Sequence, residues 1–518
     1  MKINLIGLGQ CGSFVVYDVI AYLFDLDESS KMIRAAPQSQ WKRFVRRLTS
    51  KLNSRGASWK LSMKKFFLGL KTPDIPQFFV IDGNRKNAVV DGLLGEGINK
   101  KLGPLQVLVA ALTLTNRNNG CNLGEVGEYV FRTEKEAASN SKVFSRLKTS
   151  DQIEINTLVF AGGGGSGSGG APTLNKELRN GELRNKDTLL KDALLMNMLV
   201  MPPYHISDRK QRWNTGRCIM RLSKVHKQTA LLLFSNLSES LNDQYHVNRY
   251  ISKLIVRLAN FGYVGNVPKV ATDIDRKDLQ AFFSGKPAFV GMSSLGKDKG
   301  EPTQEEIEAM VDQALTPRKK QDTEEHEMSD ENISGLSIEV PEVLEQMVLR
   351  QIKMVMVVIG LTPKYEGKVN IVDIVKRRIA KKLATDLGNL DCRAYSYTSP
   401  NEIELTIFFR HSNYQSSFLL DGFLKSYFEW YDEEKIESDY LSKILKGKLD
   451  SDFLDSLRNT LREEIEDNAS EGKTQEEEDI DDNNTDWLKK FNFPIDQNLG
   501  SFYSRKKKQT TTSVSPSG

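Results

Sequence analysis

A run of glycines and serines constrains the fold of this chain more than any other feature. Residues 162–170 read Gly-Gly-Gly-Gly-Ser-Gly-Ser-Gly-Gly, after the apolar segment Thr157–Phe160 and before a helix-like segment at Ala171–Leu178. Such a composition is typical of a flexible linker, but a linker does not usually interrupt a strand–helix unit. We therefore expect an ordered turn that joins a buried strand to a helix.

The chemistry of this run favours the binding of an anion. Glycine lets the backbone approach a ligand closely, and free N–H groups at a helix N-terminus bind phosphates. The hydroxyls of Ser166 and Ser168 can add donors. No Gly-Lys-Ser/Thr follows, so the run is not a Walker A loop. It follows an internal strand, so it is not the dinucleotide fingerprint either.

Strand-like and helix-like segments alternate through the first half of the chain. Ile3–Ile6, Phe78–Ile81 and Ala230–Phe234 are short apolar segments that predict buried strands, and Ser13–Leu26 and Val247–Phe261 have helical periodicity. This alternation predicts a parallel sheet covered on both faces. Ligands bind beyond the carboxyl ends of the strands of such sheets, where the glycine turns fall.

A second block begins near Asp273. Its apolar runs Met354–Leu361, Val369–Ile374 and Glu402–Phe409 predict an α+β domain with its own sheet. Helical segments follow, and acids dominate Glu463–Asp486. Low hydrophobicity with high charge does not offset the entropy of ordering, so we expect disorder after about residue 466.

Composition excludes several classes of protein. The chain is 39% hydrophobic and 27% charged with a formal net charge of +4, which is ordinary for a globular protein. The four cysteines are scattered, which argues against disulfides and structural zinc and favours a reducing cytosol. Without a signal peptide or an apolar stretch long enough to span a membrane, we expect a cytoplasmic protein with no transmembrane segment.

Two basic segments leave alternatives open. Residues 31–71 contain many Lys and Arg residues, several aromatic residues and no acid, and Arg505–Lys508 form a basic cluster near the end. Either segment can contact nucleic acid, an acidic adaptor or an anionic membrane surface. The alternative for residues 31–71 is a solvated helical insertion that packs on its domain through its aromatic side chains.

The glycine motifs resemble those of the tubulin/FtsZ superfamily of GTPases. Gly163–Gly169 resembles the family signature GGGTGSG or GGGTGTG, with Ser166 in place of the central Thr. Gly170-Ala171-Pro172 is similar to the Ala-Ala-Pro that follows it in FtsZ-type members, and the Gly-Gln-Cys-Gly of residues 9–12 is similar to the first nucleotide loop. The resemblance covers about residues 1–430 and does not identify a branch of the superfamily.

The resemblance implies a set of nucleotide contacts. Polar residues after the second strand would lie near the phosphates or Mg²⁺, a third loop near residues 118–127 would close over the γ-phosphate, and a Pro-Pro-Tyr loop would hold the sugar. In that last loop Ser207 stands where the family has Glu. GTP or GDP would contact Gly9, Gln10, Cys11, Gly12, Asp82, Asn84, Asn119, Gly120, Asn122, Gly163, Gly164, Gly165, Ser166, Gly167, Ser168, Gly169, Pro203, Asp208, Tyr245 (stacking on the base) and Asn248 (guanine edge). The metal ligands stay open.

The catalytic residues implied by the resemblance are Asp275 and Asp278. The segment Asp273-Ile274-Asp275-Arg276-Lys277-Asp278 is similar to the family's Asn-x-Asp-x-x-Asp/Glu loop. Carboxylates at i and i+3 share one helix face and can orient a water for attack on a γ-phosphate. In the family these acids reach the nucleotide of the next subunit across a head-to-tail contact, which builds filaments.

The expected organisation is an α/β fold with a Rossmann-like parallel-sheet GTPase domain. Residues 1–245 form this domain, with a basic insertion at 28–75. A central helix follows at 246–265, then a C-terminal α+β domain at 266–432, and a helical and then disordered tail at 433–518. The implied function is a polymerising, Mg²⁺-dependent GTPase that partners itself and a DNA-adaptor or membrane-anchor protein.

Three functional alternatives follow from the resemblance. The first is DNA or plasmid segregation, which the basic segments favour slightly. The second is cell division or cell shape, as for FtsZ- and CetZ-like proteins. The third, of another class, is a nucleotide-binding structural or regulatory protein without GTP turnover.

Overall fold

The computed structural model describes a subset of the chain, all of it within the first of two units, residues 1–444; the second is residues 445–518. The basic insertion expected at 28–75 and the tail expected after 433 lie outside the described residues, as does the charged segment Arg318–Asn332, which we expected to form a mobile loop. The described residues are 1–23, 77–82, 107–111, 124, 127–128, 131, 153–180, 193–203, 207–224, 229–236, 241–261, 267–283, 285–296, 300–316, 334–338, 352–383, 391–399, 402–411, 420, 422–424 and 426–427.

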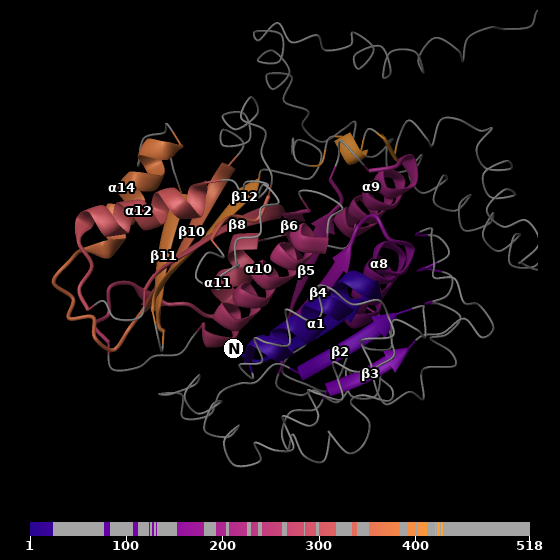
Figure 1. Ribbon diagram of the computed structural model, residues 1–518. Helices are drawn as coiled ribbons and strands as arrows, with labels where there is room; N and C mark the ends of the chain where they lie inside the picture. The colour runs from indigo at the N-terminus through magenta and orange to yellow at the C-terminus, as the bar shows by residue number, and fades with distance from the viewer. Residues whose placement is uncertain are drawn as a thin grey trace, which may run out of the picture. The chain divides into compact units, whose positions relative to one another are not determined.

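The amino-terminal half is built on six parallel strands in the order β3-β2-β1-β4-β5-β6 (Figure 1). This is the doubly wound order of Rossmann-like folds, so the expected parallel α/β sheet is confirmed. The strands are β1 (Ile3–Leu8), β2 (Gln77–Asp82), β3 (Val107–Ala111), β4 (Ile155–Ala161), β5 (Leu194–Met201) and β6 (Thr229–Ser235).

Helices cover both faces of the sheet. Leu5 and Ile6 are adjacent, both 0% exposed, and belong to different core clusters, because side chains alternate across a strand. One cluster includes side chains of α1 (Gly9–Leu23), α10 (Leu241–Asn260) and α11 (Arg276–Phe283); the other includes side chains of α8 (Gly165–Asn180), α9 (Arg209–Lys224), α12 (Gln304–Leu315) and α14 (Ile371–Lys382). None of the described helices combines the length and the apolar character needed to cross a membrane.

The second half adds a mixed set of strands to the same sheet. These are β7 (Thr272–Asp273), β8 (Pro287–Leu295), β9 (Gly335–Leu336), β10 (Ile352–Leu361), β11 (Asp391–Thr398) and β12 (Ile403–His411), in the order β8-β12-β10-β11-β7 with β9 on β8. The expectation of a separate sheet is wrong, because β8 pairs with β6 through Leu231↔Pro287 and Leu232↔Ala288. The apolar run Val369–Ile374 contains the start of α14, where Asn370 accepts a hydrogen bond from the Asp373 N–H.

Helix α10 is joined to the second half by a buried arginine. The Arg257 side chain is 1% exposed, and its Nε lies 3.1 Å from Glu404 Oε1. Its remaining nitrogens donate to Leu405 O, Thr406 Oγ1 and Ser293 O at 2.8, 3.0 and 2.9 Å. The central helix therefore has a fixed register against β8 and β12.

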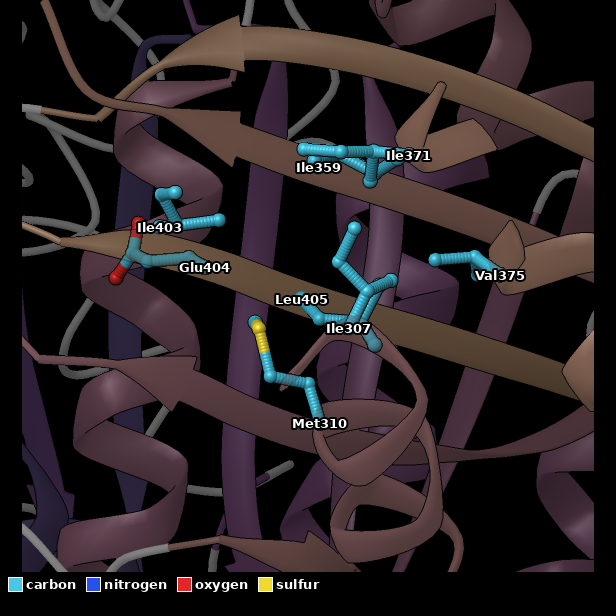
Figure 2. A pocket seen from close by; sticks show the side chains of 8 residues that line it. All are labelled: Ile307, Met310, Ile359, Ile371, Val375, Ile403, Glu404 and Leu405. Carbon is cyan, nitrogen blue, oxygen red and sulfur yellow. The ribbon is translucent and has the colours of Figure 1, made fainter. Parts of the chain in front are cut away.

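Helices α12 and α14 close an apolar pocket against the sheet (Figure 2). Side chains of both helices meet those of β10 and β12 there. Glu404, at the edge of the pocket, lies in β12, and its carboxylate also pairs with Arg257 of α10. The lining residues are Ile307, Met310, Ile359, Ile371, Val375, Ile403, Glu404 and Leu405. The hydrocarbon lining marks this pocket as part of the core of the second half.

Candidate functional site

The candidate site lies where the strand order reverses. Strand β1 pairs with β2 on one side and with β4 on the other, and Leu8 and Phe160 are register partners at their carboxyl ends. Successive connections from this point leave in opposite directions, which opens a crevice beyond the strand ends. The turns after β1 and β4, at Gly9–Gly12 and Gly162–Gly164, therefore meet at this crevice.

The two turns are in direct contact. Gly9 has φ +69, a conformation that favours glycine. A Cβ on Gly9 would lie 3.3 Å from the Gly167 N atom and 3.5 Å from Ser166 Cβ. Gln10 is exposed, and Cys11 is partly buried and packs against the core. The backbone of the first turn therefore packs directly against the start of α8.

Helix α8 begins at Gly165, six residues before the expected start at Ala171, so most of the glycine run is helix rather than loop. The Gly162 N–H donates to Val200 O at 2.9 Å and the Ser168 N–H to Gly164 O at 3.3 Å. Within the part of the chain that the structure describes, the N–H groups of residues 163–167 have no hydrogen-bond partner. No acid stands in the first turn.

These donors form a candidate anion-binding site. The first N–H groups of a helix have no partner within it, and the helix dipole adds partial positive charge at the same end. Phosphate oxygens can satisfy both. The glycine run therefore has the chemistry that binding of a nucleoside polyphosphate needs.

The two serines of the run differ in their surroundings. Ser168 is 1% exposed, and its hydroxyl donates to Gly164 O at 2.5 Å within the helix. We expected this hydroxyl to donate to a ligand, but it stabilises the first turn of the helix instead. Ser166 is only partly buried, and its hydroxyl has no partner among the described residues. Ser166 is therefore the serine that remains available to a ligand.

Sequence reasoning missed Asn214, on α9. This side chain is 0% exposed, its Nδ2 donates to Gly163 O at 2.9 Å, and its Oδ1 accepts from the Gly124 N–H at 2.9 Å. A single Asn inside a helix gives no signal in one sequence, because only the fold shows which backbone groups it meets.

A buried ion cluster lies on the same helix. Arg217 and Glu128 are 1% and 2% exposed and 2.7 Å apart, and Arg221 approaches the same carboxylate at 2.5 Å. Residues 214, 217 and 221 lie at helical spacing on one face. That face of α9 therefore holds the segment containing Gly124 and Glu128 against the start of α8.

The expected sugar and base contacts are placed around the starts of α9 and α10. Pro203 is buried, and its carbonyl accepts from the Ser207 N–H at 2.9 Å. Asp208 is exposed and accepts from the Gln211 N–H at 2.6 Å as a cap of α9. Asn248 is 8% exposed in α10, and its amide has no partner among the described residues. Tyr245 is in α10, but its side chain is outside the described set.

The two predicted catalytic acids start α11. The Asp278 N–H donates to Asp275 Oδ1 and the Asp275 N–H to Asp278 Oδ2, both at 2.9 Å. The Tyr395 hydroxyl donates to Asp278 Oδ1 at 3.1 Å. Burial, and then the Asp278 carboxylate, raise the pKa of Tyr395. Asp275 is exposed and Asp278 half-buried, so both can meet water or a ligand while they cap the helix.

The structure places these acids at the opposite end of α10 from the glycine turns. Helix α10 starts just after the carboxyl end of β6, on the side of the glycine turns. It ends at the amino end of β1, where the Met1 ammonium donates to Ala259 O and Phe261 O at 2.9 and 3.1 Å. The N-terminus is drawn at that end in Figure 1. The acids follow this end of α10 in sequence.

Several predicted contacts fall outside the description. Asp82 ends β2, but its side chain is outside the described set, as are Asn84, Asn119, Gly120 and Asn122. Within the described residues, no group of three or more His, Cys, Asp or Glu side chains is arranged to hold a metal ion.

Comparison with known proteins identifies the fold. The sequence matches no family model and no curated protein. The solved structures that are similar to it include three with a TM-score of 0.50 each. CetZ2 from Haloferax volcanii, as a GTPγS-bound protofilament, is 15% identical over 84% of this chain and 100% of its own. CetZ1 from Haloferax volcanii, as a GDP-bound monomer, is 16% identical over 83% and 100%.

The third is CetZ from Methanosaeta thermophila, which is 14% identical over 92% of this chain and 99% of its own. At these identities the likeness concerns the fold alone. The chain therefore has the fold of the tubulin/FtsZ superfamily.

Proposed function

We propose that this chain is a cytoplasmic GTPase that binds GTP beyond the carboxyl ends of β1 and β4 and hydrolyses it when subunits stack head to tail into a filament. One observation carries the proposal: among the described residues, the N–H groups of residues 163–167 have no hydrogen-bond partner, and they follow the carboxyl end of β4, which pairs with β1. These groups would suit the β- and γ-phosphates. The Asn248 amide in α10, which has no partner within the described part of the chain, would suit guanine.

The distance between the two halves of the active site supports hydrolysis across a contact. Helix α10 has 20 residues, and at 1.5 Å per residue it is about 30 Å long. Asp275 and Asp278 follow one end of it and the glycine turns lie at the other. A second copy stacked in the same orientation would bring its acids to the phosphates of the first, and such a contact repeats into an open filament.

In this arrangement each part of the chain has a defined task. Backbone donors of the glycine turns hold the phosphates, and the acids of the neighbouring subunit orient the attacking water. Bound Mg²⁺ would neutralise charge on the β- and γ-phosphates. Asp82 and Asn84, which follow β2, are the residues we propose to hold it.

The test compares substitutions within the acidic loop. Asp275→Asn and Asp278→Asn keep an oxygen that can cap α11 but remove the charge, so these variants should fold, bind GTP and assemble. We expect phosphate release to fall about 100-fold, because the water loses its orientation, and filaments to persist longer in light scattering. Asp273→Asn is the matched control, since Asp273 pairs with Lys269 at 3.2 Å on the surface, and its turnover should stay at the wild-type level.

Two results would redirect the proposal. Assembly with GTP but without phosphate release in the wild type would favour a nucleotide-binding structural or regulatory protein. Full turnover in both Asp→Asn variants would remove these acids from the mechanism.

For the cellular role we propose DNA segregation. The support is the basic character of residues 31–71 and Arg505–Lys508, because clustered cations bind the phosphate backbone. GTP filaments should co-sediment with double-stranded DNA, directly or through an adaptor, and release it as salt rises. Filaments that bind no DNA but sediment with anionic vesicles would favour cell division or cell shape instead.

A further inference from the structure

The environment of Asn214 determines how its amide must be oriented. Gly163 O, to which its Nδ2 donates, can only accept a hydrogen bond, and the Gly124 N–H, which its Oδ1 accepts from, can only donate one. Nitrogen must therefore face Gly163 and oxygen must face Gly124. Only an amide, or a protonated carboxyl group, supplies one donor and one acceptor in this geometry.

The bond to Gly163 O also fixes the direction of the next N–H group. In a trans peptide the C=O of one residue and the N–H of the next point in opposite directions. Because Gly163 O points to Asn214 on α9, the Gly164 N–H points away from α9. Gly164 is exposed, and a Cβ placed on it would meet no atom within 4 Å. The Gly164 N–H is thus aimed at the open crevice.

The frame around this bond leaves little freedom. A Cβ on Gly169 would lie 1.9 Å from Gly124 O and 2.6 Å from the Glu128 N atom, so α8 and the segment at 124–128 are in close contact. Glu128 is in turn bound to Arg217 and Arg221 on α9. Asn214 is therefore held between two rigid partners, and its amide sets the orientation of the Gly163–Gly164 peptide.

We propose that Asn214 is a positioning residue of the phosphate site: it orients the Gly163–Gly164 peptide so that the Gly164 N–H donates to a phosphate of the bound nucleotide. This inference rests on the proposed function. It adds a residue on α9 that does not itself contact the nucleotide but determines how strongly the phosphates are bound.

The experiment measures GTP and GDP affinity by titration of the full-length protein at pH 8 and pH 6. In Asn214→Asp a buried carboxylate faces Gly163 O without a proton to donate, and we expect about 10- to 100-fold weaker binding at pH 8. Burial raises the pKa of a carboxyl at this position, and the guanidinium of Arg217, which also lies beside Gly124, lowers it. We expect burial to dominate, so that at pH 6 the protonated group regains its donor. Affinity should then recover several-fold relative to the wild type at the same pH.

The matched control is Asn197→Asp. Asn197 is a 0% exposed amide that exchanges hydrogen bonds with Asn175 at 2.7 and 3.1 Å, away from the glycine turns. It should lose stability as Asn214→Asp does but keep GTP affinity at both pH values. Asn214→Ser, which buries no charge, serves if Asn214→Asp does not fold, and should bind GTP about 10-fold more weakly without pH recovery.

The outcomes separate the two proposals. Wild-type protein that binds neither GTP nor GDP overturns the proposed function and this inference together. If the wild type binds GTP and a folded Asn214→Ser or Asn214→Asp variant binds it equally well, the inference is overturned but the proposed function is not. Equal losses of affinity in Asn214→Asp and Asn197→Asp would make the role of Asn214 merely structural and also contradict the inference.

Discussion

Individual residues of the glycine run meet very different surroundings. Gly169 has no space for a side chain because Gly124 O is too close, whereas Gly164 faces open space. Gly169 is therefore required for packing. A side chain at position 164 would meet no packing partner, so a substitution there tests the proposed phosphate site without disturbing the fold.

Gly164→Asp should abolish nucleotide binding while leaving the protein folded. A carboxylate beside the phosphates repels them by about 4 kcal/mol at close range near a protein surface, which predicts at least about a 100-fold loss of GTP affinity. Gly164→Ala is the control and should bind within a few-fold of the wild type. Binding is measured by titration and folding by thermal melting; undiminished GTP binding by Gly164→Asp would contradict the site.

His411 should make the second half sensitive to acid. Its ring is 0% exposed, neither ring nitrogen has a partner among the described residues, and Phe289 packs 5.6 Å away. Burial lowers the pKa of His411 to about 4, against about 6.5 when unfolded. As the pH falls, His411 is therefore protonated in the unfolded chain before it is protonated in the folded protein. The free energy of unfolding, at its full value above pH 6.5, decreases as the pH falls toward 4.

Replacing His411 should remove this loss. We expect His411→Phe to retain up to about 3 kcal/mol more stability than the wild type between pH 6.5 and 4, measured by urea unfolding at several pH values. The two proteins should differ little at pH 8. Parallel pH profiles for both would show that His411 does not titrate on unfolding.

At the scale of elements, α10 links the two halves of the sheet. Its apolar side packs on the parallel strands, while Arg257 reaches Glu404 and backbone carbonyls of the second half. Tyr397 donates to the same Glu404 carboxylate, and burial, followed by that charge, raises the pKa of Tyr397 well above its usual value. The helix is thus held by a buried polar network as well as by apolar contact.

Arg257→Met should be strongly destabilising by itself. It leaves the Glu404 carboxylate without its cation, and breaking a buried pair in this way costs about 3–5 kcal/mol. The double variant Arg257→Met/Glu404→Gln should lose less than the sum of the two single variants, because no buried charge is left unpaired. Denaturant unfolding of the four proteins measures this coupling, and simple additivity would exclude it.

Two candidate functional regions lie at different ends of α10. The glycine turns lie at the carboxyl ends of β1 and β4, and Asp275 and Asp278 follow the far end of α10. The proposed hydrolysis across a head-to-tail contact predicts complementation between two inactive variants.

A mixture of Gly164→Asp with Asp275→Asn/Asp278→Asn protein should regain GTPase activity that neither has alone. The first retains its acids but holds no GTP, and the second holds GTP but lacks the acids. In a random copolymer about one contact in four joins the two intact halves. Phosphate release should therefore rise on mixing and depend on protein concentration. A mixture no more active than its components would contradict hydrolysis across the contact.

Local patterns determined much of this protein. The apolar segments Ile3–Ile6 and Phe78–Ile81, and the order in which strands and helices alternate, predicted the parallel sheet, because strand formation and burial follow from side-chain pattern over a few residues. The glycine run at 162–170 indicated a phosphate site for a similar reason, since its backbone properties belong to the residues themselves. The pairing of Asp275 with Asp278 likewise follows from their spacing.

Contacts between distant segments decided the rest. The union of the two expected sheets through β6 and β8 depends on neighbours far away in the chain. Asn214 acquires its importance only because Gly163 and Gly124 are brought to either side of it. Such contacts cannot be predicted from local sequence, because nearly every residue carries the same backbone N–H and C=O groups. Only the complete fold determines which of these groups a given side chain reaches.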